Sequence, residues 1–206
     1  MKPGLETFTL YVLRFTDQGV EKVAEAGVGP LSVGLYYGST DGNTRRAATL
    51  IKSLCESPPP WASVELLDVA DFYLEDMAEF DLVLLGAPTW NTGQMQRDWQ
   101  SVFDEFDTLD LDGLPVALFG LGDQEGYPDT FGDALAFLAD KVEERGARLI
   151  GRWPAAGYDF RQSWALRDGL FVGLLLDEHA QPEQSAARVA RWLDQVRSEV
   201  AQLRGE

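Results

Sequence analysis

The sequence predicts an α/β fold, a doubly wound three-layer sandwich around a parallel β-sheet. Short apolar segments recur at residues 31–37, 63–69, 80–87, 114–121 and 147–150, and helical patterns lie between most of them. Parallel neighbours need crossover connections, and right-handed crossovers place helices on both faces of the sheet. With 206 residues, 45% of them hydrophobic, the chain can form one domain with a substantial core.

The first predicted strand leads into a segment that is suited to binding phosphate. This segment reads Gly38-Ser39-Thr40-Asp41-Gly42-Asn43-Thr44, and it is followed by apolar residues at helical spacing: Ala47, Leu50, Ile51, Leu54 and Cys55. Small residues and two glycines allow backbone N–H groups to close around an anion, and the helix dipole favours negative charge at that end. We therefore predict a phosphate loop.

Two further loops follow the third and fourth predicted strands, and each carries one aromatic ring. The loop at residues 87–93 contains Trp90, and the loop at residues 120–127 contains Tyr127. Ligands of doubly wound folds bind beyond the carboxyl ends of the strands, near the switch in strand order. Since two aromatic rings can sandwich a flat heterocycle, the predicted ligand is a planar mononucleotide.

The remaining chain is predicted to contain two helices and an insertion. Two apolar stripes have helical spacing: Phe131, Ala134, Leu135, Leu138 and Val142, and then Val189, Trp192, Leu193, Val196, Val200 and Leu203. Residues 151–170 interrupt the fifth strand, which we expect to resume at residues 170–176. Because this insertion is rich in aromatic residues, we predict a folded surface lobe rather than a disordered linker.

The charge of the chain limits its partners. The formal net charge is −17, which argues against nucleic acid or an anionic membrane and favours a basic protein. The segment from Asp98 to Asp140 contains eleven acidic residues and no Lys, Arg or His. The single cysteine, Cys55, excludes an internal disulfide and is interpreted as a core residue, and no apolar segment is long enough to cross a bilayer. We expect a cytoplasmic protein.

Four segments in order give the chain a resemblance to a known family. They are Ser39 to Thr44, Pro88 to Asn91, Gly122 to Tyr127, and Gly157 to Phe160 together with Leu176 to Glu178 around the strand-splitting insertion. Over about residues 31–203 the chain resembles the long-chain flavodoxins. The resemblance implies a five-stranded sheet in the order 2-1-3-4-5 and FMN held without covalent attachment. It also implies one-electron transfer between a flavodoxin/ferredoxin reductase-type donor and an acceptor enzyme. We expect a monomer, with no catalytic residue and no metal.

The resemblance assigns FMN binding to three loops. Carried over by position, Trp90 and Tyr127 flank the two isoalloxazine faces, while backbone groups of Asn91 and Thr92 meet flavin N5. In the family, the peptide after the Trp reorients on reduction so that its carbonyl accepts the N5 proton, and Asn tolerates the backbone dihedrals that this needs. The full predicted set is Ser39, Thr40, Asp41, Gly42, Asn43, Thr44, Pro88, Thr89, Trp90, Asn91, Thr92, Gly93, Gly120, Leu121, Gly122, Asp123 and Tyr127.

Three features depart from the family pattern. Arg45 and Arg46 open the first helix, where cations oppose the dipole; either the FMN phosphate offsets their cost, or they point away into solvent. His179, the only histidine, stands where the family often continues acidic. Residues 1–30 precede the predicted FMN-binding domain at residues 31–206, and the apolar segment from Thr7 to Thr16 could add an edge strand, bind a partner or form a loose tail.

The predicted function is a low-potential one-electron carrier. Reduced FMN tends to carry negative charge, which the acidic segment around the ring loops would repel. One alternative is a flavodoxin-like NAD(P)H quinone reductase, although that reaction needs an open pocket over one flavin face and an anionic dinucleotide would meet an acidic rim. A non-redox phosphate-binding module leaves the paired aromatics without a purpose, and an NTPase lacks the Gly-Lys-Ser/Thr ending of its loop.

Overall fold

The central sheet is parallel and has the predicted strand order. A computed structural model describes residues 10–16, 19–25 and 29–205. The sheet runs β4 (Ala62–Asp68), β3 (Leu31–Tyr37), β5 (Leu82–Trp90), β7 (Pro115–Leu121) and β12 (Leu174–Leu176). Every pair of neighbours in this row is parallel. The fold class and the 2-1-3-4-5 order are therefore confirmed.

The fifth strand is split along one edge of β7, as predicted. β8 (Arg148–Ile150) pairs with Pro115–Ala117 of β7, and β12 pairs with Phe119–Leu121 farther along the same strand. One expectation was wrong, because only the last three residues of the segment 170–176 return to the main sheet. β11 (Leu170–Phe171) instead pairs antiparallel with β9 (Trp153–Pro154) and β10 (Leu166–Arg167). These three short strands form a small sheet inside the insertion.

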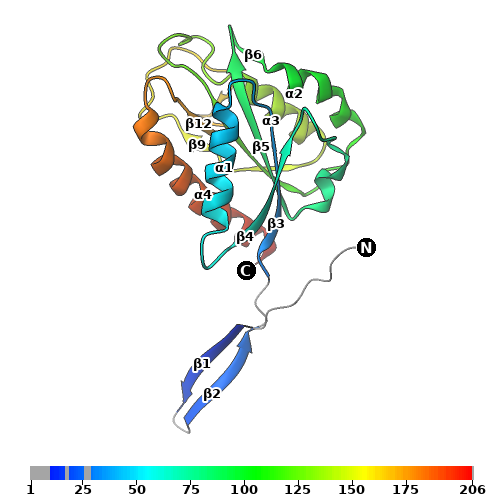
Figure 1. Cartoon of the computed structure of the whole chain (residues 1–206), viewed down its shortest axis with the longest axis vertical. Helices are drawn as coiled ribbons and strands as arrows, with labels where there is room; N and C mark the ends of the chain where they lie inside the picture. The colour runs from blue at the N-terminus through cyan, green and yellow to red at the C-terminus, as the bar shows by residue number, and fades with distance from the viewer. Residues whose placement is uncertain (1–9, 17–18, 26–28, 206) are drawn as a thin grey trace.

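Helices cover both faces of the sheet. α1 (Asn43–Cys55) and α4 (Pro182–Arg204) lie against each other on one side, and α2 (Arg97–Val102) and α3 (Ala134–Glu144) lie on the other (Figure 1). Two 3₁₀ segments, η1 (Glu75–Glu79) and η2 (Phe103–Thr108), complete the connections. The last helix buries Val189, Trp192 and Val196 completely, as their spacing predicts.

Two residues of the predicted apolar stripes do not lie on the buried face of a helix. Phe131 is fully buried but precedes α3, which begins at Ala134. Its ring packs against rings from the insertion, with centroids 5.6 Å from Phe160 and 6.0 Å from Phe171, so it joins the lobe to the body. Leu203 is 43% exposed because it lies in the last turn of α4.

The N-terminal segment does not extend the main sheet. β1 (Leu10–Thr16) pairs with β2 (Gly19–Glu25) in an antiparallel two-stranded sheet of its own. An edge strand of the main sheet, one of the three alternatives left open for this segment, is therefore not seen for Leu10–Thr16, while Thr7 to Thr9 lie outside the described residues. The division at residues 30 and 31, and the role of the extension, remain predictions. In the described part of the chain, no helix has the length and apolar character needed to cross a membrane.

Candidate functional site

The predicted phosphate loop connects β3 to α1. Gly42 immediately precedes the helix with a φ of 83°, in the left-handed region that glycine adopts without strain. The Oγ of Ser39 accepts a hydrogen bond from the N–H of Arg45 at 3.2 Å, which folds the loop back onto the first helical turn. Among the described residues, no acceptor is bonded to the backbone N–H groups of residues 40–44. These donors and the positive end of the helix dipole are free to receive an anion.

A buried glutamine supports this loop from below. Gln96 is 1% exposed, and its Nε2 donates to the Thr40 Oγ1 at 3.2 Å while its Oε1 caps α2 by accepting the N–H of Trp99. The absence of a side chain at Gly38 makes room, because a Cβ there would lie 2.4 Å from the Gln96 Oε1. Gln96 therefore positions the phosphate loop, and its place in the sequence gave no signal of this role.

The second loop is the tip of a hairpin. The end of β5 pairs with β6 (Gln94–Met95), so that Trp90 lies opposite Gln94 and three residues form the turn. Asn91 has a φ of 47°, a left-handed conformation that asparagine tolerates better than most residues. Its Nδ2 donates to the Gln94 Oε1 at 2.7 Å. The turn thus holds Asn91 in a left-handed backbone conformation and fixes the tip of the hairpin.

The third loop is held by two carboxylates. The Oδ1 of Asp123 accepts the N–H groups of Glu125 at 3.1 Å and Gly126 at 2.7 Å, which forms the turn that presents Tyr127. Asp177 is fully buried at the end of β12, and its Oδ2 accepts the N–H of Gln124 at 3.0 Å. Its Oδ1 accepts the N–H groups of His179 and Ala180, so its burial is offset by three hydrogen bonds, of which the one from Gln124 joins the third loop to the end of β12.

The three loops enclose one cavity of about 430 Å³, within the roughly 300–1,000 Å³ typical of ligand pockets. Trp90, which is half-buried, and Tyr127, which is 45% exposed, both line it. The other predicted residues that line it are Ser39, Thr40, Asp41, Asn43, Thr44, Pro88, Thr89, Asn91, Leu121, Gly122 and Asp123.

Four predicted residues do not line this cavity. Gly42 shapes the phosphate loop from behind, and Thr92 and Gly93 face a neighbouring cavity. Gly120 lies inside the sheet, where a Cβ would approach the Leu135 Cδ1 to 2.1 Å, so the structure gives it a packing role. Three lining residues were not in the predicted set: Arg46, Glu178 and His179.

The two arginines of α1 point in different directions. The Nη2 of Arg45 lies 2.8 Å from the Asp68 Oδ2, its guanidinium carbon lies 5.9 Å from the centre of the Tyr37 ring, and the hydrogen bond to Asp68 raises its pKa. Arg46 instead lines the cavity and donates to the Asn43 Oδ1. Its guanidinium also lies close to Gly42, since a Cβ added to that glycine would be 3.7 Å from the Arg46 Nη1. Arg45 thus belongs to an ion pair, whereas Arg46 adds positive charge to the phosphate loop.

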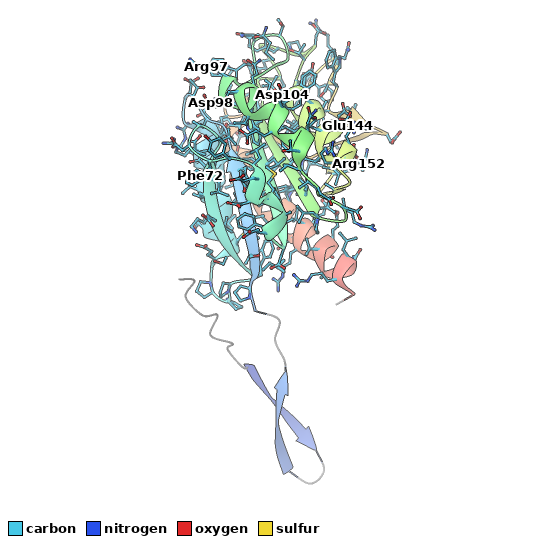
Figure 2. All side chains as sticks on the ribbon, turned by 90° about the vertical axis from the view of Figure 1, so that its right-hand side faces the viewer. Phe72, Arg97, Asp98, Asp104, Glu144 and Arg152 are labelled. Atoms are coloured by element: carbon cyan, nitrogen blue, oxygen red, sulfur yellow. The ribbon has the colours of Figure 1, made fainter. Side chains whose placement is uncertain are left out.

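The acidic segment from Asp98 to Asp140 is partly neutralised by cations from outside it. Lys141 lies 2.5 Å from Asp107 and lowers the pKa of that carboxyl, and Arg167 lies 2.6 Å from Asp140. Arg161, from the insertion, pairs with Asp129. Asp98 lies in α2 and Asp104 in η2 (Figure 2), and among the described residues neither belongs to an ion pair. The local field is therefore weaker than the sequence segment alone predicts.

The donor set of the cavity suits a planar phosphate ester rather than a metal. It combines unbonded N–H groups, small hydroxyl side chains and one arginine with an aromatic ring on each of two other loops. An exposed tyrosine at its edge could be covered by a flat ligand. Within the described residues, no group of three or more His, Cys, Asp or Glu side chains could hold a metal ion.

Comparisons with known proteins agree with this geometry. The family model described as flavodoxin matches residues 35–192. A flavodoxin of a Picosynechococcus species is 42% identical over 165 residues, covering 80% of this chain and 95% of that protein. Flavodoxin 1 of Salmonella typhimurium is 42% identical over 168 residues, covering 81% of this chain and 93% of that protein.

A solved structure shares the fold at lower identity. Fusobacterium nucleatum flavodoxin bound to flavin mononucleotide superposes with a TM-score of 0.77 at 23% identity. The match covers 82% of this chain and 98% of that chain.

Proposed function

Because the chain belongs to the flavodoxin family, we propose that its 430 Å³ cavity holds FMN without covalent attachment and that the protein carries single electrons between partners. The observation that carries this proposal is the convergence of a phosphate loop, Trp90 and Tyr127 on one cavity. Bound FMN supplies the redox chemistry. The chain supplies binding, orientation and the electrostatic environment.

The phosphate end of FMN would lie at residues 39–44. The unbonded N–H groups of this loop and the dipole of α1 favour a dianion, and the Arg46 guanidinium is placed to donate to it. Gln96 keeps Thr40 in place through its hydrogen bond. These contacts select FMN over riboflavin, which has no phosphate.

The ring end would lie between Trp90 and Tyr127. The two side chains cover a flat ring and exclude water from it, which disfavours an anionic reduced state. Asn91, already at a φ of 47°, would allow the peptide between Asn91 and Thr92 to turn its carbonyl toward the ring and accept a hydrogen bond from the flavin N5–H. The Asn91 side chain keeps the hairpin closed through Gln94.

Negative charge around the ring would keep the potential low. Asp123, on the loop that carries Tyr127, lines the cavity with Glu178 and His179, whereas Asp41 and Arg46 lie at the phosphate loop. A unit charge about 10 Å away contributes roughly 1.7 kcal/mol at an effective dielectric of about 20. Since about 1.4 kcal/mol corresponds to roughly 59 mV for one electron, a few acids suffice for tens of millivolts after screening.

The partners we propose are basic redox proteins, a reductase-type donor and an acceptor enzyme. The net charge of −17 supports this, because long-range attraction speeds encounter with a basic surface. We also propose that the protein acts as a monomer in the cytoplasm, and that it has no turnover of its own. A single buried cysteine, which needs no oxidising compartment, supports that location.

Two measurements on the purified protein test the proposal. The apoprotein should quench the fluorescence of FMN at one equivalent, and the FMN-loaded protein should not oxidise NADPH unless a reductase is added. A protein that ignores FMN would refute the site. Direct oxidation of NADPH with reduction of a quinone would instead favour the reductase alternative.

A further inference from the structure

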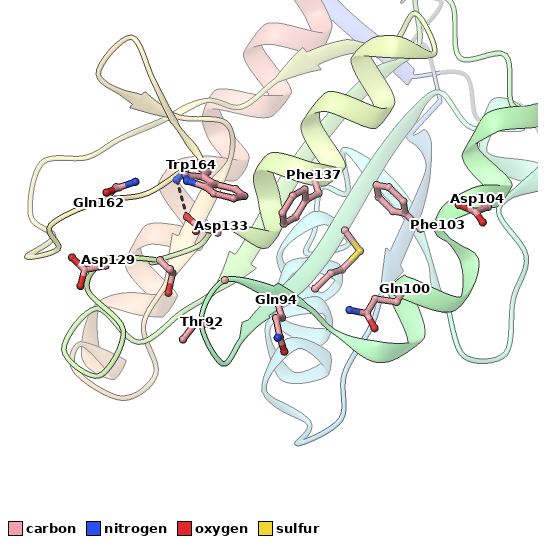
Figure 3. A pocket seen from close by; sticks show the side chains of 13 residues that line it. Thr92, Gln94, Gln100, Phe103, Asp104, Asp129, Asp133, Phe137, Gln162 and Trp164 are labelled. Atoms are coloured by element: carbon pink, nitrogen blue, oxygen red, sulfur yellow. Dashed lines mark hydrogen bonds between the residues drawn. The ribbon is translucent and has the colours of Figure 1, made fainter.

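A second and larger cavity lies beside the proposed flavin site. It measures about 640 Å³ and is formed by the β5–β6 hairpin, the α2–η2 segment, α3 and the insertion (Figure 3). Thr92 and Gly93, which belong to the turn that follows Trp90, face this cavity. Its volume exceeds that of any single side chain, so an occupant would fill it with several residues or with a larger molecule.

The wall of this cavity is mainly apolar and includes an exposed tryptophan. Trp164 is 56% exposed and meets Phe137 edge to face, with ring centroids 5.7 Å apart. Met95 and Phe103 extend the apolar surface, and Figure 3 shows Phe137 between Trp164 and Phe103. A large ring left this exposed beside a cavity is typical of a binding surface.

The charges on the lining are all negative. Asp104, Asp129 and Asp133 line the cavity, and none of the Lys, Arg or His residues in the described part of the chain does. Asp133 is only 2% exposed, its Oδ1 accepts the backbone N–H of Trp164 at 2.7 Å, and burial raises its pKa. Among the described residues, no ion pair includes Asp133 or Asp104.

The nearby cations are already engaged. Arg161 pairs with Asp129. Lys141 lies 5.3 Å from the centre of the Phe103 ring but pairs with Asp107 at 2.5 Å. The buried carboxyl of Asp133 therefore lacks the cation that such groups usually have.

We propose that this cavity receives an arginine side chain, together with its flanking residues, from a protruding basic loop of a partner protein. An arginine satisfies both properties of the lining, because its stem packs on apolar surface while its guanidinium stacks on aromatic rings and bonds to carboxylates. That the partner is a redox protein rests on the function proposed above.

The position of the cavity would bring such a partner close to the flavin. Trp90 and Asn91 line the flavin cavity, while the next two residues of the same turn line this one. Asp133 lies directly behind that turn, since a Cβ on Gly93 would be 2.9 Å from the Asp133 Oδ2. An arginine bound at Asp133 would therefore dock its protein against the hairpin that holds the ring.

A peptide titration of the FMN-loaded protein tests the proposal. The probe is the peptide acetyl-Gly-Gly-Arg-Gly-Gly-amide, compared with the same peptide carrying citrulline, which is uncharged and has nearly the same shape. Binding is followed by ¹⁵N NMR through the Trp164 indole N–H and the amides of Thr92 and Gly93. We expect saturable shifts with the arginine peptide and at least fivefold weaker binding of the citrulline peptide.

Variants identify the groups responsible. Asp133→Asn keeps an acceptor for the backbone N–H of Trp164, and Trp164→Ala removes an exposed ring, so both variants should fold. Each should lower the affinity for the arginine peptide at least fivefold. Tyr73→Ala is the matched control, because Tyr73 is 73% exposed but lies on the loop after β4, outside the cavity. It should change the affinity less than twofold.

Three outcomes would overturn the proposal. Equal binding of the citrulline and arginine peptides would show that the cavity does not recognise the positive charge. NMR shifts spread over the whole acidic surface would show that the arginine peptide is attracted without a specific site. An equal loss in Tyr73→Ala would exclude a role particular to Trp164. Peptide binding is read from protein resonances and the proposed function from the flavin spectrum, so the two can fail independently.

Discussion

Replacing Arg46 with glutamine should weaken FMN binding while leaving riboflavin binding unchanged. Arg46 lines the flavin cavity and its guanidinium lies over the phosphate loop, near Asn43 and Gly42. A hydrogen bond to a charged group contributes about 1.5–3 kcal/mol, and the exposure of Arg46 favours the lower end of that range. Since about 1.4 kcal/mol is a factor of ten, we expect a roughly tenfold rise in the Kd for FMN.

The assay is a fluorescence titration of the apoprotein with FMN and, separately, with riboflavin. Arg45→Gln is the matched control, because it removes the same charge one residue earlier from a side chain that faces Asp68. It should change either Kd by less than twofold. The reasoning is refuted if Arg46→Gln raises the Kd values for FMN and riboflavin equally, or if Arg45→Gln raises the Kd for FMN as much as Arg46→Gln does.

Three further predictions concern the turn, the core and the partners. Asn91→Gly should raise the potential of the first reduction step by about 20–60 mV, because glycine allows the peptide to turn at a lower conformational cost. A spectroelectrochemical titration measures this potential, and an unchanged value would contradict the prediction. Burial raises the pKa of the Cys55 thiol to about 12 from an ordinary 9.0. The contribution of the buried, protonated thiol to the free energy of unfolding is therefore complete below pH 9 and is lost between pH 9 and 12. Urea unfolding of Cys55→Ala should show a pH slope shallower there by about 1.4 kcal/mol per unit, and an identical slope would exclude this cause. Electron transfer to a basic partner should slow steeply as salt increases, in stopped-flow experiments, whereas salt-independent second-order rates would show that charge does not steer the encounter.

Much of the fold could be predicted because its signals are local and periodic. Apolar segments predicted the five strands except for the first part of the segment 170–176, helical stripes such as that of Trp192 predicted α1, α3 and α4 but not α2, and loop chemistry placed the phosphate loop at the start of α1. The order of the strands came from the resemblance, not from the pattern. The helical spacing of Phe131 was misleading, since its burial arises from contacts with the insertion, which are distant in sequence.

The role of Gln96 was missed, and the choice between the two positions of Arg45 and Arg46 stayed open, for the same reason. Gln96 supports Thr40 from fifty-six residues away, and Arg46 differs from Arg45 only in which neighbour it meets after folding. The charge of the acidic segment was overestimated because Arg161 and Arg167 reach it from the insertion. Such contacts depend on the packed structure, and no short window of sequence contains them.

The most direct test of the central claim is an absorption spectrum of the FMN-loaded protein recorded during stepwise chemical reduction. A carrier that moves one electron at a time, with the Asn91 carbonyl able to accept a hydrogen bond from the flavin N5–H, predicts that a blue one-electron-reduced form accumulates between two separate steps. Conversion of the oxidised protein directly to the fully reduced one, with no intermediate spectrum, would contradict it.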